Sequence, residues 1–227
     1  MNPEAIFDAI RSNDAARARE LLAADPALAS ARNADGLSAL TIAAYYRRAE
    51  IVRDLLARGI ALDIWEAATV GDSARVRELL TADPALVNSV SPDGFAPLGL
   101  AAYFGHYSTA EALVDAGADV NATARNPSRV RPLHSAAANA NAETALDMAR
   151  LLLLDGADAN AAQQGGWTPL HQAADNNNPD LVAILLVHYA DPFARADNGQ
   201  TALDMALARG ATAAAAHLRR AMGLSAD

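Results

Sequence analysis

Residues 167–174 read WTPLHQAA, the clearest copy of a pattern that recurs along this chain. Its alanine Ala173 is followed twelve residues later by Leu185, and the same step recurs in five other places. A seventh pair, Ala136 and Leu152, has a longer step. The anchor alanines lie at positions 9, 43, 67, 101, 136, 173 and 206, so a unit of roughly 33 residues recurs. This recurrence indicates a stack of similar structural repeats.

Each unit has the pattern of a helix, a tight turn, a second helix and a looped return. In the sixth unit, Thr168 can cap the first helix, and Pro169 stands at its first position, where no backbone N–H is needed. The apolar positions of the two helices recur at helical spacing. They are Leu170, Ala173, Ala174, Leu181, Ile184, Leu185 and Leu186. Because one helix pair cannot bury its apolar side alone, the units should stack on one another.

The T-P-L-H-x-A core at residues 168–173, with its recurring unit, resembles the ankyrin repeat. The resemblance covers about residues 2–222. It implies an all-α repeat solenoid of about seven ankyrin repeats with short hairpin loops and degenerate caps, in a single domain spanning 1–227. The expected repeats lie near 2–33, 34–62, 63–91, 92–124, 125–162, 163–195 and 196–222.

Glycines mark the expected turns and helix ends. Gly71, Gly105 and Gly210 stand in the turn between the two helices, where Arg47 and Asn177 stand in two other repeats. A second set follows the second helices, where a left-handed residue is common: Gly59, Gly117 and Gly156. Tyr189 takes that place in the sixth repeat, so we expect a strained left-handed tyrosine there.

One step in the series is too short. The step from Ala43 to Ala67 is shorter than every other anchor step, so the hairpin that normally projects between repeats should be missing from residues 60–64. Asp63 instead precedes the next helix directly, with Glu66 three positions later as in a capping box. We expect a gap in the row of hairpin tips and a shallower groove at this place.

Two further features concern the spacing of repeats. The fifth repeat gains four residues around 139–143, about one helical turn, so a helix can lengthen there without rotating its buried face. A larger duplication spans the first four repeats. The sequences at 19–22, 25–28 and 35–36 recur at 77–80, 83–86 and 93–94, which indicates a two-repeat unit copied once.

Composition excludes several classes of protein. The net charge of −9 argues against nucleic acid and anionic membranes as partners, since both require clustered cations. No cysteine is present, and all 18 cations are arginine. A cysteine nucleophile, a P-loop lysine and a Schiff-base lysine are therefore excluded. The composition fits a GC-rich bacterial genome. We expect no signal peptide, no membrane span and a cytoplasmic location.

The candidate chemical sites each have a structural explanation. The resemblance implies that His134 and His171 hydrogen-bond backbone between adjacent repeats. The pair His134 and Ser135 suggests a base and a nucleophile, but adjacent helical residues point in different directions. The polar run at 175–180 lacks the glycine and distal glutamate of a calcium loop, so it reads as an inter-helix turn. We expect no catalytic residue, no metal and no cofactor.

Four aromatic residues follow the alanine pair of a first helix: Tyr45, Tyr46, Tyr103 and Phe104. The resemblance places these positions on the exposed concave face, and only 5% of the chain is aromatic. Exposed aromatic patches often mark binding surfaces. Because one repeat intervenes, regular stacking predicts that the two pairs lie about 20 Å apart. The alternative is that the rings only fill gaps left by neighbouring alanines.

Other candidate contact residues lie in equivalent positions or at the hairpin tips. The equivalent positions further along hold the polar residues Asn139, Asp175 and Asn176, so the concave face should change from aromatic to polar along its length. Phe95 and Trp167 follow tip glycines, and Trp167 could instead pack on the neighbouring hairpin. One longer loop concentrates positive charge in Arg125, Arg129 and Arg131, which suits an acidic partner or a solvated loop.

These features predict a non-enzymatic protein that binds another protein through its concave face and hairpin tips. A preformed groove would lose little ordering entropy on binding. The alternative is a regulator or immunity-type inhibitor whose acidic face blocks the basic active site of an enzyme, as the charge of −9 permits. We expect a monomer.

Overall fold

The computed structural model describes residues 3–225, which form seven helix pairs and no named strand. The expected start of the first repeat at Asn2 lies outside these residues. The first helices of the pairs are α1 (Glu4–Arg11), α3 (Ala39–Tyr45), α5 (Ile64–Val70), α7 (Pro97–Phe104), α9 (Pro132–Ala137), α11 (Pro169–Asp175) and α13 (Ala202–Ala208). The second helices are α2 (Ala15–Ala24), α4 (Ala49–Leu56), α6 (Ser73–Ala82), α8 (Tyr107–Asp115), α10 (Ala142–Leu154), α12 (Pro179–Val187) and α14 (Thr212–Ala221).

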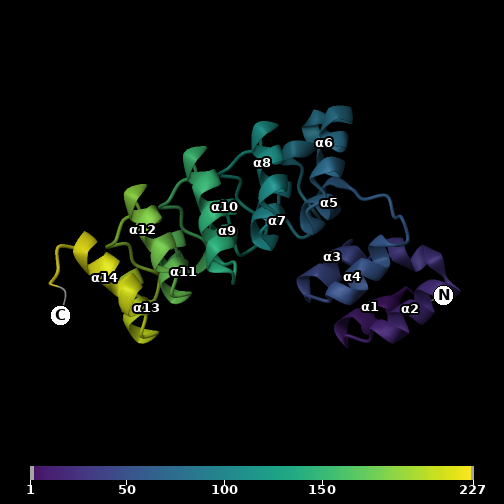
Figure 1. The fold of residues 1–227 in the computed structure, drawn as a ribbon, viewed down its shortest axis with the longest axis horizontal. Coiled ribbons are helices and arrows are strands. Elements are labelled where there is room, and N and C mark those ends of the chain that lie inside the picture. The colour runs from purple at the N-terminus through teal and green to yellow at the C-terminus, as the bar shows by residue number, and fades with distance from the viewer. Residues whose placement is uncertain (1–2, 226–227) are drawn as a thin grey trace.

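The helices form two layers. The first helices pack one against the next from α1 to α13, and each second helix packs on the first helix of its own pair. The pairs follow one another as an elongated arch, with α1–α4 set off at the N-terminal end (Figure 1). A single cluster of buried, mostly alanine and leucine side chains runs between the layers. The chain is therefore an all-α repeat solenoid, as its periodicity predicts.

The duplication is visible in the helix boundaries. α6 begins and ends at the positions that the duplication assigns to a copy of α2. The short 3-10 helices η1 (Pro26–Ser30) and η2 (Pro84–Asn88) match in the same way. The capping residues also correspond: Asp14 and Asp72 accept a backbone N–H at the start of α2 and α6. A third 3-10 helix, η3 (Gln164–Gly166), has no counterpart in this pattern.

The four extra residues of the fifth repeat lengthen its second helix. α10 has 13 residues, whereas α8 and α12 have 9 each. Asn141 caps the added turn by accepting the N–H of Thr144. Because the insertion is about one full turn, Leu152 stays fully buried.

The left-handed conformation that the sequence predicts after the second helices is present, since Gly59, Gly117 and Gly156 have φ of +66°, +86° and +87°. The turn between the two helices of a repeat is left-handed as well. Gly71 and Gly105 both have φ near +79°, while Arg47 and Asn177 have φ of +56° and +50° in the same turn. Tyr189 has φ of +63°, so the tyrosine after α12 is strained.

A ladder of asparagines joins successive loops. The side chain of Asn88 accepts the N–H of Asp119, and that of Asn121 accepts the N–H of Asp158. Asn160 continues the series by accepting the N–H of Asp191 and donating to the carbonyl of Tyr189. Each amide thus satisfies backbone groups of the next repeat and fixes the spacing between loops.

The hairpin between the second and third repeats is missing, as the short step predicts. Only residues 57–63 connect α4 to α5, whereas each other second helix is joined to the next first helix by a longer segment such as 83–96. Within residues 3–225, isolated β-bridges join Arg32 to Ser38 and Arg195 to Thr201, and none involves residues 57–63. Asp63 caps α5 in a capping box with Glu66, and Arg32 contacts both carboxylates.

The missing hairpin does not leave the expected gap in the row of tips. A Cβ added to Gly36 at the second tip would lie 3.4 Å from the ring of Pro92 at the fourth, so these tips already touch. The outer layer opens instead: α2 packs on α4, and α6 on α8, but α4 and α6 do not pack side by side. Because one hairpin is missing, the hairpin tips of the neighbouring repeats meet, and the outer helices α4 and α6 on the opposite edge of the stack are spread apart. We call the connection at residues 57–63, together with the tips at Gly36 and Pro92 and the neighbouring ends of α3, α4, α5 and α7, the joint.

Two hairpin-tip glycines test how tightly the loops are packed. Gly94 and Gly199 have φ of +92° and +83°, so alanine should cost about 1 kcal/mol of strain at either position. A Cβ at Gly94 would lie 2.9 Å from the backbone carbon of Arg125, whereas nothing lies within 4 Å at Gly199. We expect Gly94→Ala to lower the free energy of unfolding by a further ~1–3 kcal/mol in urea titrations. Equal losses in the two variants would show that the loops adjust freely.

Candidate protein-interaction surface

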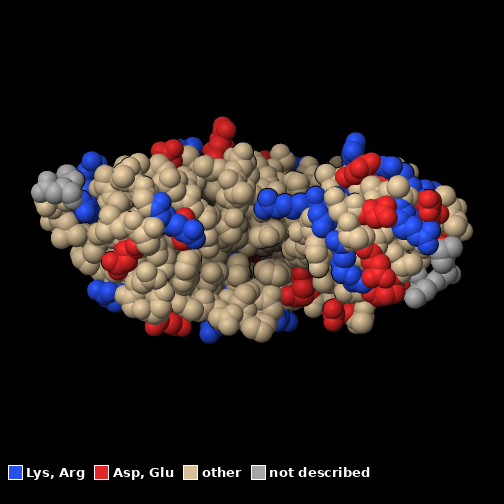
Figure 2. Space-filling view, turned by 90° about the horizontal axis from the view of Figure 1, so that it is seen from below, with Lys and Arg blue, Asp and Glu red and all other residues tan. Residues whose placement is uncertain are grey.

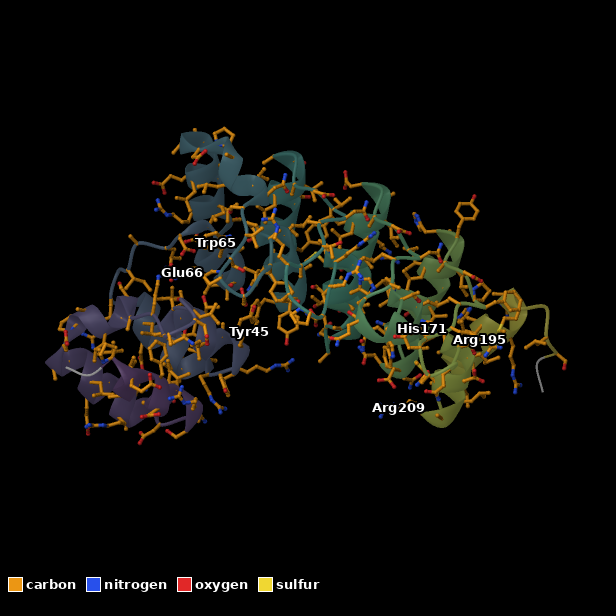
Figure 3. All side chains as sticks on the ribbon, turned by 180° about the vertical axis from the view of Figure 1, so that it is seen from behind. Tyr45, Trp65, Glu66, His171, Arg195 and Arg209 are labelled. Carbon is orange, nitrogen blue, oxygen red and sulfur yellow. The ribbon has the colours of Figure 1, made fainter. Side chains whose placement is uncertain are left out.

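Three aromatic rings from two repeats meet at the joint. The ring centroid of Tyr45, at the end of α3, lies 6.0 Å from that of Tyr103 and 5.4 Å from that of Phe104, both at the end of α7. Tyr103 and Phe104 meet edge to face at 5.1 Å, and the ring of His106 stacks on Phe104 at 6.3 Å. Figure 3 places Tyr45 where the N-terminal helices meet the rest of the arch.

This arrangement corrects the separation of about 20 Å expected between the two aromatic pairs. That expectation assumed that the intervening repeat holds its neighbours apart at regular helix-packing distances. The third repeat has no hairpin, so the second and fourth tips meet over it, and the rings at the ends of α3 and α7 are in contact. The intervening positions hold Thr69 and Val70, which are smaller than aromatic rings.

The four aromatic residues are not equally exposed, contrary to the expectation that all lie on an open face. Tyr45 and Phe104 are half-buried and pack on the core, whereas Tyr46 is 47% exposed and Tyr103 is 41% exposed. The Tyr45 hydroxyl donates to Oδ2 of Asp93 at 2.6 Å. Burial first, and then this hydrogen bond, raise the pKa of Tyr45 above its ordinary value. Tyr45 and Phe104 thus pack on the core as the gap-filling alternative expects, and their contact with a partner stays a prediction.

A groove of about 270 Å³ runs beside the exposed edge of this cluster. Its walls come from the turns that follow three first helices. They are formed by Ala44, Tyr45, Arg47, Tyr103, Phe104, Asn139, Ala140 and Asn141. Aromatic, cationic and amide groups thus face one hollow, which suits a peptide or protein surface better than a small metabolite.

The polar candidates take part in bonds within the chain. The side-chain amide of Asn139 donates to the carbonyl of Tyr103 at 3.3 Å, and that of Asn176 donates to the carbonyl of Ala137 at 2.9 Å. Asp175 accepts two hydrogen bonds from Arg209, at 2.7 and 3.0 Å. These residues join neighbouring repeats, and their contact with a partner stays a prediction.

The hairpin-tip candidates differ from each other. Phe95 is half-buried and packs on the core beside Gly99, where an added Cβ would lie 3.7 Å from its ring. Trp167 is half-buried, and its ring centroid lies 6.3 Å from that of His171 in its own repeat. Both rings therefore support their own loops, and only their outer edges remain for a partner.

The histidines of the TPLH-like motif link adjacent repeats. Nδ1 of His171 accepts the backbone N–H of Thr168 at 3.1 Å, and Nε2 lies 3.2 Å from the carbonyl of Gln200 in the next repeat. His134 repeats this arrangement, with Nε2 3.3 Å from the carbonyl of Trp167. A ring that accepts at Nδ1 and donates at Nε2 must be neutral. The predicted structural role is therefore confirmed.

Among the loop arginines, Arg131 has a carboxylate partner. Arg131 contacts Asp158 at 3.2 Å, and Arg129 adopts φ of +52° in the loop. Within residues 3–225, no group of three or more acidic or histidine side chains could hold a metal ion. The run at 175–180 forms the end of α11, the turn and the start of α12.

The sequence reasoning overlooked three arginines at the joint. Arg47, Arg48 and Arg53 lie around a notch of about 380 Å³ between α4 and the ends of α5 and α7. In the repeat pattern Arg47 is a turn residue, and Arg48 and Arg53 look like ordinary surface residues. The signal that could have found them is the short step itself, because it removes the neighbour that would cover α4.

The family described as ankyrin repeats (3 copies) matches residues 64–163 and 133–223. The chain belongs to the ankyrin-repeat family. Residues 3–63 lie outside these matches, yet the structure continues the same helix pairs through them. Ankyrin repeats generally mediate protein–protein interaction.

Several curated proteins share the repeats over short stretches. Human 2-5A-dependent ribonuclease is 42% identical over 66 residues, which are 29% of this chain and 9% of that protein. The mouse ankyrin repeat and SAM domain-containing protein 6 is 30% identical over 145 residues, which are 64% of this chain and 12% of that protein. A rice BTB/POZ domain and ankyrin repeat-containing protein, NPR5, is 46% identical over 74 residues, which are 32% of this chain and 14% of that protein.

The chain thus spans 9–14% of the length of these relatives. All three are eukaryotic, so they do not support the bacterial origin expected from composition. The ankyrin family is typically non-enzymatic, although one of these relatives is a ribonuclease. The longest helix, α10, has 13 residues, and none in the described part of the chain has the length and apolarity needed to cross a membrane.

The buried histidines should make stability depend on pH. Burial lowers the pKa of His134 from its ordinary 6.5 to about 4, and burial also lowers that of His171. The unfolded chain therefore binds protons more readily than the folded chain, so stability present above pH 6.5 is lost as the pH falls toward 4. Between pH 7 and 5, His134 should account for about 2 kcal/mol of the loss, measured by urea unfolding at each pH. His134→Ala should be less stable at pH 7 but lose less between the two pH values; an unchanged loss would contradict the assignment.

Proposed function

We propose that this chain is a non-enzymatic protein-binding scaffold whose partner contacts the edge formed by the exposed rings of Tyr46 and Tyr103. The observation that carries the proposal is the exposure of these two rings, 47% and 41%. Tyr103 lines the groove at the joint, and Tyr46 stands in the chain between Tyr45 and Arg47, which both line it. Exposed aromatic residues in a preformed hollow are typical anchors of protein interfaces. The proposal includes the outer edges of Phe95 and Trp167 and the polar rim formed by Asn139, Asp175 and Asn176.

Packing inside the cluster supports this proposal. Tyr45 is tied to Asp93 and lies against Tyr103, so the exposed ring is held in place before any partner arrives. Arg48 lies 5.7 Å from the ring centroid of Tyr46 and restricts that ring in the same way. A rigid anchor loses little conformational entropy on binding. A monomer in the cytoplasm, recognising one protein partner and neither nucleic acid nor membrane, remains the simplest form of the proposal.

The second candidate function is regulation, in which the chain acts as an immunity-type inhibitor of a partner enzyme. The charge of −9 favours it, because an acidic protein can block a basic active site. Such a complex should associate much more slowly at high salt, whereas binding through aromatic anchors should depend weakly on salt. Stopped-flow association of the captured partner at two salt concentrations distinguishes the two functions.

Paired substitutions test the aromatic edge. We expect Tyr46→Ala with Tyr103→Ala to reduce affinity for the captured partner at least tenfold, since a central aromatic anchor typically contributes ~2 kcal/mol or more. The thermal midpoint should fall by only a few degrees, because Tyr46 is exposed and Tyr103 gives up ring contacts that contribute about 0.5–1.5 kcal/mol. Affinity capture with mass spectrometry would identify the partner, and titration calorimetry would measure its affinity.

Tyr189→Ala is the matched control, because Tyr189 is 88% exposed and lies after α12, far along the solenoid. It should leave capture intact. The proposal fails if the double variant and the control bind the partner equally well. It also fails if the double variant loses both its partner and its cooperative thermal unfolding transition.

A further inference from the structure

One face of α4 lacks the cover that a following second helix gives to α2, α6, α8, α10 and α12. In α2, Ala18 and Leu22 are fully buried, at 0% exposed, where α2 packs against α4. The corresponding residues of α4 are Val52 and Leu56, and no second helix packs on them in turn. Val52 is only half-buried, and Leu56 is 36% exposed. The joint has therefore left an apolar helix face without its usual neighbour.

α6 shows that this exposure belongs to the joint and not to the duplicated sequence. Its corresponding pair, Val76 and Leu80, is 0% and 8% exposed where α8 packs on α6. The slot that is covered in α2 and α6 is thus open in α4 alone among these three helices.

The open face lines the notch of about 380 Å³. Ala49, Val52, Arg53 and Leu56 have the spacing i, i+3, i+4 and i+7, so they form one stripe along α4. The remaining walls come from the neighbouring turn and from the ends of α5 and α7. They consist of Ala44, Arg47, Arg48, Thr69, Val70, Phe104 and His106. The notch therefore has an apolar floor and lies where an outer-layer helix would otherwise pack.

The charge around the notch is opposite to that of the whole chain. Three arginines line it and no carboxylate does, although the chain has 27 acidic residues and 18 basic ones. Arg48 donates to the carbonyls of Ile10 and Arg11, while Arg47 and Arg53 form no ion pair with the described residues. Figure 2 shows blue side chains along the upper rim of a hollow near the middle of the underside and red ones at its lower right. The notch thus favours a negatively charged partner.

The chain itself contains a template for the missing helix. Arg19 occupies in α2 the slot that Arg53 occupies in α4, and it contacts two carboxylates of the helix that covers it. Those carboxylates are Glu50 and Asp54, one helical turn apart on α4, and the bond to Asp54 is 2.8 Å long. A helix that covered α4 in the same way would present two carboxylates one turn apart to Arg53 and pack apolar side chains on Val52 and Leu56.

We propose that the notch binds one acidic amphipathic helix of a partner protein, as an added helix of the outer layer. The proposal rests on the protein-binding function proposed above and names the chemistry of the partner. A second copy of this chain is a poorer occupant: at the free edge of α2, the positions that correspond to Glu50 and Asp54 hold Ala16 and Glu20. A second copy would therefore offer Arg53 a single carboxylate, which already pairs with Arg17.

A synthetic peptide tests the proposal without knowledge of the natural partner. The probe is a fluorescein-labelled helical peptide of about 18 residues, a length that can fold in water, with leucines along one face and two glutamates one helical turn apart. A second peptide carries lysines in place of those glutamates. Fluorescence anisotropy measures the binding of both to the full chain at low and at moderate salt. We expect the acidic peptide to bind at least tenfold more tightly than the basic one, and more weakly as salt rises.

Charge reversal at equivalent slots provides the decisive comparison. Arg53→Glu should weaken binding of the acidic peptide at least tenfold, since it replaces attraction to two carboxylates by repulsion. Arg77→Glu is the matched control, because Arg77 holds the same slot on α6, whose apolar face α8 covers. It should leave binding unchanged, and circular dichroism should show both variants folded.

Three results would overturn the proposal: no binding of the acidic peptide, equal binding of both peptides, or equal effects of Arg53→Glu and Arg77→Glu. None of them depends on Tyr46 or Tyr103. Failure of the notch is therefore distinguishable from failure of the aromatic edge, which is measured with the captured partner and the tyrosine variants.

Discussion

The length of one connection sets the shape of the molecule. Elsewhere, the segment that returns from a second helix to the next first helix includes a hairpin that keeps neighbouring repeats apart at one edge. Between α4 and α5 only residues 57–63 remain, and the hairpin is lost. The tips at Gly36 and Pro92 therefore meet, and α4 and α6 are left apart in the outer layer. The aromatic cluster lies at the closed edge and the notch at the open edge, so both result from the missing hairpin.

Contacts at the closed edge replace part of the packing lost at the open one. The Tyr45 ring packs against two rings of the fourth repeat, and pairs of this kind contribute about 0.5–1.5 kcal/mol beyond their buried area. Arg32 adds bonds to Asp63 and to the buried Glu66 at the start of α5. Figure 3 labels Trp65 and Glu66 on α5 and Tyr45 at the end of α3, the helices that precede and follow α4. In a repeat protein each unit depends on its neighbours, so these contacts hold the first four helices to the rest.

The sequence predicted most of the local structure because local structure depends on short-range chemistry. The duplication predicted the boundaries of α6 and η2 from those of α2 and η1, and the anchor spacing predicted both the missing hairpin and the extra turn of α10. The histidine bonds followed from the repeat resemblance. The relative position of the repeats on either side of residues 57–63 did not follow from it, because regular stacking was assumed to continue across the gap. The distance from Tyr45 to Tyr103 and the exposure of Leu56 both depend on that position, so neither could be predicted correctly.

The natural absence of cysteine makes the closed joint directly measurable. Cysteines replacing Gly36 and Pro92 can be treated with a short bismaleimide, and the linked peptides can be identified by mass spectrometry. A Cβ at Gly36 would lie 3.4 Å from the Cβ of Pro92, so the reagent should join the two cysteines rapidly within one molecule. A second protein, with residues 57–63 replaced by a copy of segment 83–96, regains a hairpin and should not be joined, because regular stacking places the positions about 20 Å apart. Equal cross-linking of both proteins, or of neither, would contradict the role assigned to the missing hairpin.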